Sequence, residues 1–405
     1  MIGYLESVSV KNKTYKLDFK DCFAVNLAVD KNGVYDGYGL TEIAKVFKLT
    51  NAVAVYNADN KYFIYCNDGS VYQVTAISRV YMGNAGGSPP RLISVLSGNT
   101  VKYLFVGKNS FYINGAAVDI PAASVATLHN GRLFTANGRV VTFSKPFDFE
   151  NNSVSLTPYG TLGVCERAGN VVGFYSDSDK LAIICEHAIY NLTAFGESID
   201  FNFERLNISA LDVKANSIVC FNDGCIFLSG EKLYKYSNGK ITVQETLLNN
   251  FNFTVCGSAA QKDGIYLLPV TVNGENYIYA LNNMDGRESF IATTSAIIAD
   301  GGLILSGGVV NKLTDSGFMG ERILSTNPID FGISGVKTVC VISASVGADC
   351  TLKVKGDFGE KRYSLKTGGN IIKTNLKSQA FTFSLSSANC FTVKNFNVKY
   401  RIKGE

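Results

Sequence analysis

The sequence predicts an all-β protein, a β-propeller of about six to seven blades followed by a small C-terminal β-sandwich. Three observations lead to this prediction: a recurrent hairpin-turn dipeptide, hairpins spaced at about the length of a propeller blade, and a change of pattern after Phe331. Helical periodicity is nearly absent, and its best candidate is the short segment at residues 40–49. A sandwich or a β-solenoid throughout is the alternative fold.

The turn chemistry is the strongest of the three signals. Asn-Gly or Asp-Gly occurs about a dozen times between runs rich in Val, Ile, Tyr and Phe. These dipeptides tolerate the positive φ that two-residue hairpin turns demand. The clearest examples are Asp68-Gly69, Asn130-Gly131, Asn137-Gly138, Asp223-Gly224, Asn238-Gly239 and Asn273-Gly274.

The hairpins recur at irregular intervals of roughly 40–50 residues, which is the length of a four-stranded propeller blade. Candidate blades centre near residues 65, 105, 137, 185, 230, 272 and 305, so the propeller body is expected at 46–320. The blades share a pattern of strands and turns but little sequence identity. Residues 1–45 are expected to form an extended arm that supplies a strand to close the ring.

The C-terminal segment at 325–405 differs from the body in pattern and in charge. Its strands alternate strictly, which indicates one buried and one solvated face and predicts a small sandwich of five or six strands. It holds 12 Lys/Arg against five Asp/Glu, although the whole chain has a net charge of only +4. Such a module could follow a nucleic-acid backbone, but a solvated sandwich surface is the favoured interpretation. We expect its cations to be spread over a face and not grouped in a groove; they include Lys353, Lys355, Lys361, Arg362, Lys394, Lys399, Arg401 and Lys403.

Residue types that carry catalytic or metal chemistry are sparse. The only histidines are His129, which begins the turn HNGR, and His187, which lies in a strand-like run beside Glu186; neither is accompanied by a nucleophile motif. Asp177 and Asp179 have the spacing that can open a calcium loop, but no bidentate Glu follows them. No Walker loop is present. The sequence therefore predicts no enzyme, no cofactor and no metal site.

The ten cysteines lie mostly in apolar, strand-like runs and are expected to be reduced thiols. Cys220 and Cys225 form the closest pair. With a turn centred on Asp223-Gly224, Cys225 would lie opposite Asn222, and the two thiols would be out of register. This register argues against both a disulfide and a zinc half-site.

The chain shows no targeting or membrane segment that we can identify. Its first residues lack the basic start and apolar core of a signal peptide, and no run of 18 uncharged apolar residues occurs. We therefore expect a protein that is neither secreted by that route nor membrane-spanning.

Two blocks of the sequence resemble a family of viral proteins. The segment LHNGRLFTANGRVVTFSKPFDFEN at 128–151 resembles the blade signature of bacteriophage tail-assembly proteins, and VCERAGNVVGFYSDSDKLAIICEHAIYNLTAFG at 164–196 resembles their following blade. STNPIDFG at 325–332 and the ending NFNVKYRIKG at 395–404 are similar to their C-terminal β domain. The likeness covers roughly 200 residues and identifies no individual functional residue.

This resemblance implies a virion protein of the nozzle, hub or tail-stabilisation type found in short-tailed phages. Such a protein would form a homo-oligomeric ring, with a hexamer as the leading expectation, and would assemble in the host cytoplasm. It would contribute to the DNA passage, which DNA crosses without specific binding, and would dock other tail or connector proteins. A receptor- or carbohydrate-binding propeller is the alternative, although the chain contains no Trp for stacking against sugars.

Overall fold

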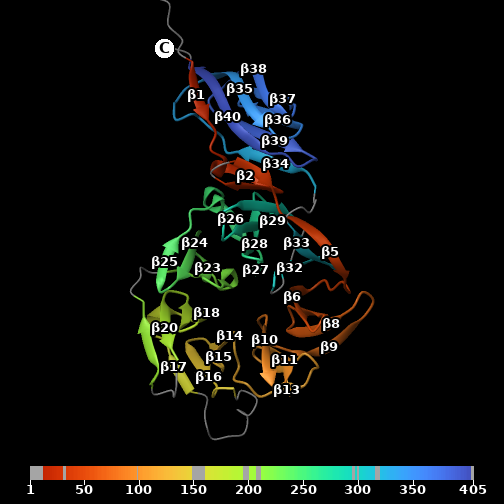
Figure 1. Ribbon diagram of the computed structural model, residues 1–405, viewed down its shortest axis with the longest axis vertical. Helices are drawn as coiled ribbons and strands as arrows, with labels where there is room; N and C mark the ends of the chain where they lie inside the picture. Colours follow the sequence, from red (N-terminus) through yellow and green to blue (C-terminus); the bar gives the residue numbers. More distant parts are fainter. Residues whose placement is uncertain are drawn as a thin grey trace, which may run out of the picture.

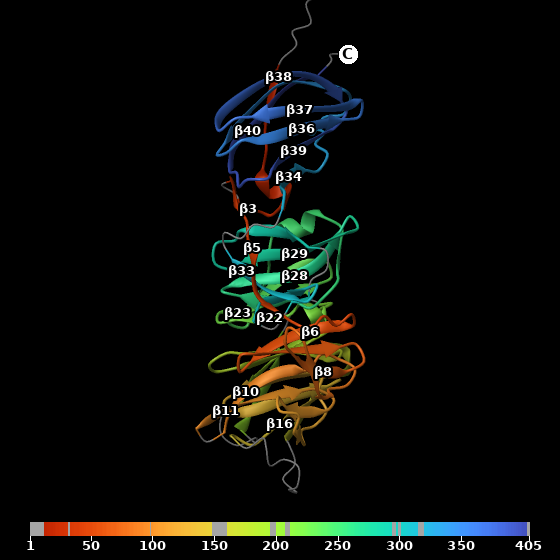
Figure 2. The same ribbon diagram turned by 90° about the vertical axis from the view of Figure 1, so that its right-hand side faces the viewer.

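The chain folds into a ring of small sheets joined at one side to a larger sheet (Figures 1 and 2). The computed structural model describes residues 12–30, 33–97, 99–147, 160–194, 200–206, 211–293, 297–298, 301–314 and 320–402. Within these ranges the secondary structure is β-strand with short 3-10 turns and no α-helix, so the all-β prediction is confirmed. The 3-10 turns are Phe19–Asp21, Glu166–Ala168, Ala215–Ser217 and Leu247–Asn250.

The ring consists of six four-stranded sheets and a seventh sector that belongs to the larger sheet. We number these blades along the chain. Blade 1 comprises β6 (Ala52–Ala58), β7 (Lys61–Cys66), β8 (Ser70–Val74) and β9 (Arg79–Asn84). Blade 2 comprises β10 (Arg91–Ser97), β11 (Thr100–Val106), β12 (Ser110–Tyr112) and β13 (Ala117–Val118). Blade 3 comprises β14 (Val125–His129), β15 (Arg132–Asn137), β16 (Val140–Phe143) and β17 (Gly160–Gly163).

The remaining blades complete the circle. Blade 4 comprises β18 (Val171–Ser176), β19 (Leu181–Cys185), β20 (Ile189–Thr193) and β21 (Asn202–Arg205). Blade 5 comprises β22 (Val219–Phe221), β23 (Gly224–Ser229), β24 (Lys232–Ser237) and β25 (Lys240–Val243). Blade 6 comprises β26 (Phe253–Val255), β27 (Ala260–Lys262), β28 (Ile265–Val272), β29 (Glu275–Asn282) and β30 (Glu288–Ala292). Blade 7 comprises β31 (Ile297–Ile298), β32 (Leu303–Ser306), β33 (Val309–Thr314) and β5 (Gly39–Lys45). Each of the seven predicted centres falls within one blade.

Hydrophobic packing between neighbouring blades closes the ring. Seven clusters of buried residues occur, and each joins one blade to the next. Phe63 of blade 1 packs against Phe105 of blade 2 with ring centroids 5.5 Å apart, and Ile64 of blade 1 shares a cluster with Val310 of blade 7. Because every blade buries both faces against neighbours, the circle itself is the core of the body.

Four of the turn dipeptides form the hairpins that the sequence predicts. Asn130-Gly131, Asn238-Gly239, Asp263-Gly264 and Asn273-Gly274 each occupy both positions of a two-residue loop. Their φ angles are 48–52° at the first position and 72–83° at the second. Positive φ at both positions is the requirement of a type I′ turn, whose twist matches that of the paired strands.

Blade 7 takes its outer strand from the N-terminal region. Strand β5 pairs antiparallel with β33, with Leu40 opposite Leu313. The helical candidate at 40–49 is therefore wrong: its first part is strand β5 and its remainder contains no helix. The segment's weak helical periodicity is outweighed by the hydrogen bonds and the buried contacts that pairing with β33 supplies.

The larger sheet contains 16 strands, including blade 6. Its central order is β37-β36-β39-β34-β2-β30-β3-β4-β40-β35-β38, and β1 pairs with β40. Its N-terminal strands are β1 (Lys13–Lys16), β2 (Cys22–Val25), β3 (Leu27–Asp30) and β4 (Gly33–Asp36). Its C-terminal strands are β34 (Arg322–Thr326), β35 (Lys337–Val346), β36 (Cys350–Gly356), β37 (Gly359–Leu365), β38 (Gly368–Ser378), β39 (Phe381–Ser387) and β40 (Val393–Ile402).

The C-terminal strands β34 to β40 do not form a sandwich of their own, because they belong to the larger sheet. The sheet is nearly closed, and the Tyr363 hydroxyl of β37 donates to Thr374 Oγ1 of β38 at 2.7 Å, which links its two end strands. Strands β1, β2, β3 and β4 pair within this sheet and do not extend as a free arm. Buried residues alternate with half-buried or exposed ones along β36 and β39, as the sequence predicts.

The propeller is joined to the rest of the larger sheet through β30, which lies between β2 and β3. Asn26 separates those two strands with a φ of 55°, and its amide N–H donates to the Phe290 carbonyl at 2.7 Å. The Asn26 side chain accepts from the Ala292 amide at 3.1 Å and donates to the Glu321 carbonyl at 3.0 Å. The Phe290 ring contacts Phe23 at 4.7 Å between centroids. The junction is therefore continuous in hydrogen bonds and in hydrophobic packing.

Candidate functional site

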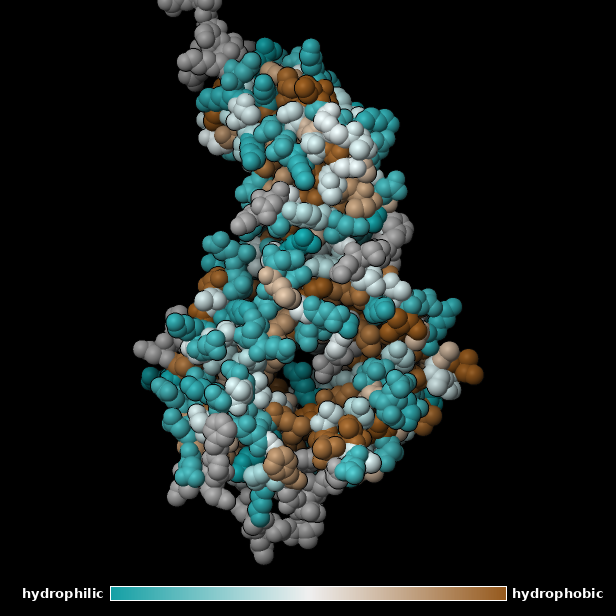
Figure 3. All heavy atoms as spheres, in the orientation of Figure 1, coloured by the Kyte–Doolittle hydropathy of each residue, from teal (hydrophilic) through white to brown (hydrophobic). Residues whose placement is uncertain are grey.

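The centre of the ring is a channel lined by the innermost strands of the blades. A hollow of about 570 Å³ opens where these strands begin, at residues such as Val125 and Val171, and beside the β15–β16 and β19–β20 turns. A second hollow of about 460 Å³ continues along the same strands and shares Arg91, Val125 and Ile218 with the first. Figure 3 shows the ring hollowed at its centre. We call the side with the 570 Å³ opening the entry face and the opposite side the turn face.

The entry opening offers few charged groups. Arg91 and Glu186 are the charged residues among those described as lining it. The Glu186 carboxylate accepts from the Asn170 amide N–H at 2.8 Å and from Asn170 Nδ2 at 3.4 Å, so it fastens the segment before β18 to the β19–β20 turn. Of the described lining residues Tyr56 alone is aromatic, and its hydroxyl donates to the Pro90 carbonyl at 2.7 Å. The opening is lined mainly by small, neutral side chains.

The two histidines lie at different places and have different partners. His187 Nδ1 lies 2.8 Å from the Leu211 carbonyl. His129 is buried, with Nδ1 2.9 Å from Ser176 Oγ and Nε2 3.1 Å from Asn130 Nδ2. The sequence did not suggest the contact between His129 and Ser176, because 47 positions separate the two residues.

The His129–Ser176 contact resembles part of a nucleophile–base pair, but its hydrogen bonds run in the wrong direction. The Asn130 amide group donates to Nε2, which places the imidazole proton on Nδ1, and Nδ1 then donates to Ser176 Oγ. A general base must instead accept the serine proton. Burial also lowers the pKa of His129. This arrangement therefore holds a turn in place and does not activate Ser176.

The spacing of Asp177 and Asp179, which the sequence analysis weighed as a calcium loop, belongs to a turn. Asp177 and Asp179 lie in the turn between β18 and β19, where the Asp177 carboxylate accepts from the Ser178 amide at 2.7 Å. The described part of the chain holds no group of three or more His, Cys, Asp or Glu side chains placed to bind a metal ion.

Of the basic residues that the sequence analysis named, Lys403 lies outside the described residues. Nor does any helix in the described ranges have the length and apolar character needed to cross a membrane.

The predicted register of Cys220 and Cys225 is wrong. The two residues lie directly opposite each other on β22 and β23, because Phe221 pairs with Gly224 and the loop is Asn222-Asp223. All ten cysteines are nevertheless free thiols in the structure. Burial raises the pKa of the Cys225 thiol, and Cys220 Sγ contacts the Phe174 carbonyl at 3.2 Å.

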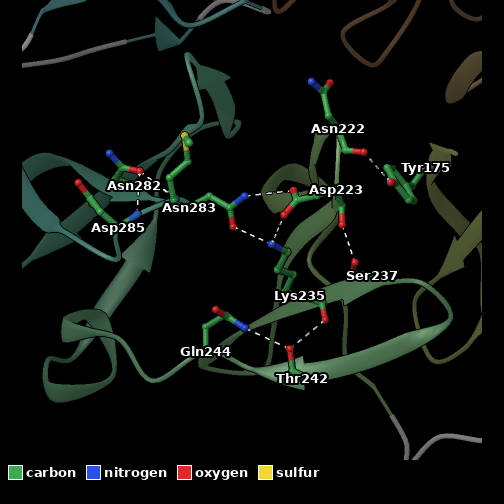
Figure 4. Close-up of polar contacts among 11 residues, drawn as sticks. Tyr175, Asn222, Asp223, Lys235, Ser237, Thr242, Gln244, Asn282, Asn283 and Asp285 are labelled. Carbon is green, nitrogen blue, oxygen red and sulfur yellow. Dashed lines mark hydrogen bonds and ion pairs between the residues drawn. The ribbon is translucent and has the colours of Figure 1, made fainter.

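A polar network on the turn face connects blades 5 and 6 (Figure 4). Lys235 Nζ lies 2.6 Å from Asp223 Oδ2 and donates to Asn283 Oδ1 at 3.0 Å. Asn283 Nδ2 in turn donates to Asp223 Oδ1 at 3.2 Å, which closes a three-residue cycle. The hydrogen bond from Lys235 lowers the pKa of Asp223. Because its members come from blades 5 and 6, this network links the two neighbouring blades.

Exposed apolar side chains gather on the turn face of blades 1 and 2. Ile77 lies in the β8–β9 turn and is 88% exposed, and Leu96 in the β10–β11 hairpin is 71% exposed. Leu96 lies directly opposite Val101, and Val80 and Tyr81 of β9 are also exposed. We call these five residues the apolar sector. Figure 3 shows hydrophobic spheres beside the central hollow, over the region where Figure 1 labels β6, β8, β10 and β11.

Comparison with known proteins supplies no family. No protein-family model matches the sequence, and no curated protein matches it. Similar solved structures include PorZ, an essential surface component of the type-IX secretion system of Porphyromonas gingivalis. The match to PorZ has 13% sequence identity and a TM-score of 0.42, and it covers 87% of this chain and 46% of the PorZ chain. The Pan2 WD40 domain of Neurospora crassa has 8% identity and a TM-score of 0.42, and the match covers 72% of this chain and 98% of that domain. The AfRom2 CNH domain has 9% identity and a TM-score of 0.44, and the match covers 68% of this chain and 98% of that domain.

The chain spans less than half the length of the PorZ chain that it matches. These similarities concern the β-propeller fold alone, which the strand topology shows independently.

Proposed function

We propose that the protein is a structural subunit of a bacteriophage tail, a non-enzymatic, ring-forming protein of the nozzle, hub or tail-stabilisation type. In the virion it would surround part of the DNA passage and dock neighbouring tail proteins. The sequence supports this proposal through the blade-like segments at 128–151 and 164–196 that resemble such proteins. Its mechanism would be geometric, since it would rest on contacts between subunits and not on a reaction.

The observation that carries the proposal is the apolar sector. Soluble monomers rarely expose contiguous apolar surface of large extent, and such surface is typical of an interface. The β10–β11 hairpin of blade 2 places Leu96 and Val101 side by side on a long strand pair, and Ile77 lies on the neighbouring blade 1. A second copy of this chain, or a neighbouring tail protein, would cover these side chains in an assembly.

The junction between the propeller and the rest of the larger sheet supports the same role. Hydrogen bonds of Asn26 and the packing of Phe290 make the two parts one continuous body. A subunit of a ring must hold its contact surfaces at fixed angles for the ring to close. A continuous sheet provides that geometry more directly than a flexible linker.

The test is the oligomeric state of the purified full chain. Light scattering at about 50 μM and negative-stain imaging should reveal closed rings, since permanent interfaces commonly bury more than about 2,000 Å². The double variant Leu96→Asp/Val101→Asp should weaken assembly at least about tenfold, because it places two carboxylates in the apolar contact.

Val243→Asp/Phe358→Asp is the matched control, because it replaces two exposed apolar residues outside the apolar sector with the same two charges. It should assemble as the wild type does. A wild-type protein that remains monomeric, or equal loss of assembly in both double variants, would contradict the proposal.

A second candidate function is a receptor- or carbohydrate-binding propeller. The entry opening favours it, because its volume of about 570 Å³ lies in the range of small-ligand sites. Binding there would depend on Arg91 and Glu186, its charged lining residues. A glycan array followed by Arg91→Ala and Glu186→Gln variants tests it. Saturable binding lost in those variants would support this function, and an array without signal would refute it.

A further inference from the structure

Strands β1, β40, β35 and β38 carry an unusual surface. They are consecutive in the larger sheet and lie at the end of the molecule away from the propeller (Figures 1 and 2). None of these four strands, all within the described residues, contains an Asp or a Glu. Six exposed cations project from their outer face, which we call the cationic face: Lys16, Lys373, Lys377, Lys394, Lys399 and Arg401.

The strand register places these cations in rows across the face. Lys373 on β38 and Lys399 on β40 pair with the same residue of β35, the strand between them. Lys377 and Arg401 likewise flank Thr338 of β35. With strands about 4.8 Å apart, the two cations of a row are separated by about 10 Å. The charges are thus spread over the outer face, as expected from the sequence, and not gathered in a groove.

On the other side of this nearly closed sheet, three cations form ion pairs with carboxylates. There Lys353 and Arg362 form ion pairs with Glu360 at 2.8 and 3.2 Å, and Lys366 pairs with Asp349 at 2.8 Å. The six residues of the cationic face form no ion pair with another described residue. Within the described residues, no carboxylate therefore neutralises the charge of this face.

The residues between the cations indicate which polyanion fits. Small polar side chains such as Ser343, Ser345 and Asn397 share the outer face and can donate hydrogen bonds to phosphate oxygens. The aromatic side chains Phe396 and Tyr400 belong to the core on the opposite face. Single-stranded nucleic acid is bound largely by stacking bases on exposed aromatic rings. This face lacks such rings among its described residues; besides the exposed aliphatic side chain of Ile371, opposite Ser343, it offers charge and hydrogen bonds.

We propose that the cationic face binds the phosphate backbone of duplex nucleic acid without reading its sequence. The inference deepens the proposed function by naming a partner for this sheet, and it rests on that function only for the source of the nucleic acid. Duplex DNA carries one charge per about 1.7 Å of axis, so a face of this size meets many phosphates at once. Cations spread over an open face favour weak, salt-dependent contact, which suits a polymer that must move past the surface.

The test is fluorescence anisotropy of the full chain with duplexes of about 20 base pairs and unrelated sequences, over a series of salt concentrations. We expect a Kd of about 1–100 μM near physiological salt, equal for all sequences. If about four to six phosphates are contacted, log K should fall against log salt with a slope of about −4 to −5. The triple variant Lys373→Gln/Lys399→Gln/Arg401→Gln should weaken binding roughly 10- to 100-fold and reduce that slope by up to about 3.

The matched control is Lys353→Gln/Arg362→Gln/Lys366→Gln, which removes the same charge from the ion-paired side. It should retain affinity within about threefold, because those three cations lie on the other side of the sheet and share the carboxylates of Glu360 and Asp349. Equal loss in both triple variants would overturn the proposal, as would absence of binding at low salt or a strong preference for one sequence. Competition by polyglutamate as effective as unlabelled duplex at equal charge would also overturn it and would assign an acidic protein instead. These results do not depend on ring formation, so this proposal and the proposed function can fail separately.

Discussion

Replacing Glu288 by Gln should make the stability of the protein less dependent on pH. Glu288 is buried at the junction on β30, where its Oε2 accepts from the Leu247 amide and from the Tyr279 hydroxyl, each at 2.6 Å. Burial raises the pKa of this carboxyl from its ordinary value of 4.5 to about 7, although both hydrogen bonds and the charge of Lys20 act in the opposite direction. The carboxyl therefore stays protonated up to a higher pH in the folded chain than in the unfolded chain.

The sign and size of the effect follow from this shift. Below pH 4.5 the carboxyl is protonated in both states and Glu288 carries no penalty. As the pH rises from 4.5 to about 7 the unfolded state ionises first, so the folded state loses stability. A difference of about 2.5 pKa units corresponds to about 3 kcal/mol, lost in full above pH 7. Gln has a similar shape, accepts the same two hydrogen bonds and does not ionise.

The assay is urea denaturation of wild type and Glu288→Gln from pH 5 to pH 8, followed by far-UV circular dichroism. The stability of the variant relative to wild type should rise by about 2.5 kcal/mol across this range, because part of the difference is already present at pH 5. Glu275→Gln is the control, because Glu275 also accepts from a tyrosine hydroxyl, that of Tyr277, but is exposed in a hairpin. If the difference in unfolding free energy between Glu288→Gln and wild type does not change with pH, burial does not raise the pKa of Glu288.

Two further predictions concern the junction and the thiols. Phe290→Ala should lower the free energy of unfolding by about 3–5 kcal/mol, because it leaves a cavity at a fully buried ring. Limited proteolysis should then separate the propeller from the rest of the larger sheet. An unchanged digestion pattern would argue against the junction as a structural link. Brief alkylation of the native protein should label the exposed Cys165, Cys220 and Cys256 first and the buried Cys225 last, as mass spectrometry would detect. A pair that resists alkylation after non-reducing denaturation would contradict the assignment of ten free thiols.

The blades could be predicted because their signals are local. At Asn238-Gly239 two adjacent residues specify a type I′ turn, and the flanking strands pair in the register that this turn imposes. The same dipeptide rule failed at Asp223-Gly224. There Gly224 is itself paired with Phe221, which shifts the loop by one residue and brings Cys220 opposite Cys225. A shift of one residue is invisible in composition but changes every cross-strand neighbour.

The parts of the fold that the sequence does not reveal depend on distant pairings. Residues 13–36 look like an unattached arm because their partners lie far along the chain, as in the pairing of Lys13 with Tyr400. The entry opening gathers residues from all seven blades, so no sequence window contains it. The basic character of the C-terminal segment was visible in its composition. The separation of its cations into an ion-paired side and a cationic face requires the strand register.

The pairing of the earliest strands with the latest also has a consequence for synthesis on the ribosome. Strand β5 must await β33, about 270 residues later, and β1 must await β40, about 380 residues later. At about 5–20 residues per second the nascent chain exposes these unpaired strand edges for roughly 15–80 s. During that time neighbouring nascent chains on one messenger present identical edges to each other, which favours exchange of N-terminal strands between copies. Expression at low temperature or with chaperones that shield extended segments should therefore raise the yield of correctly closed rings of blades.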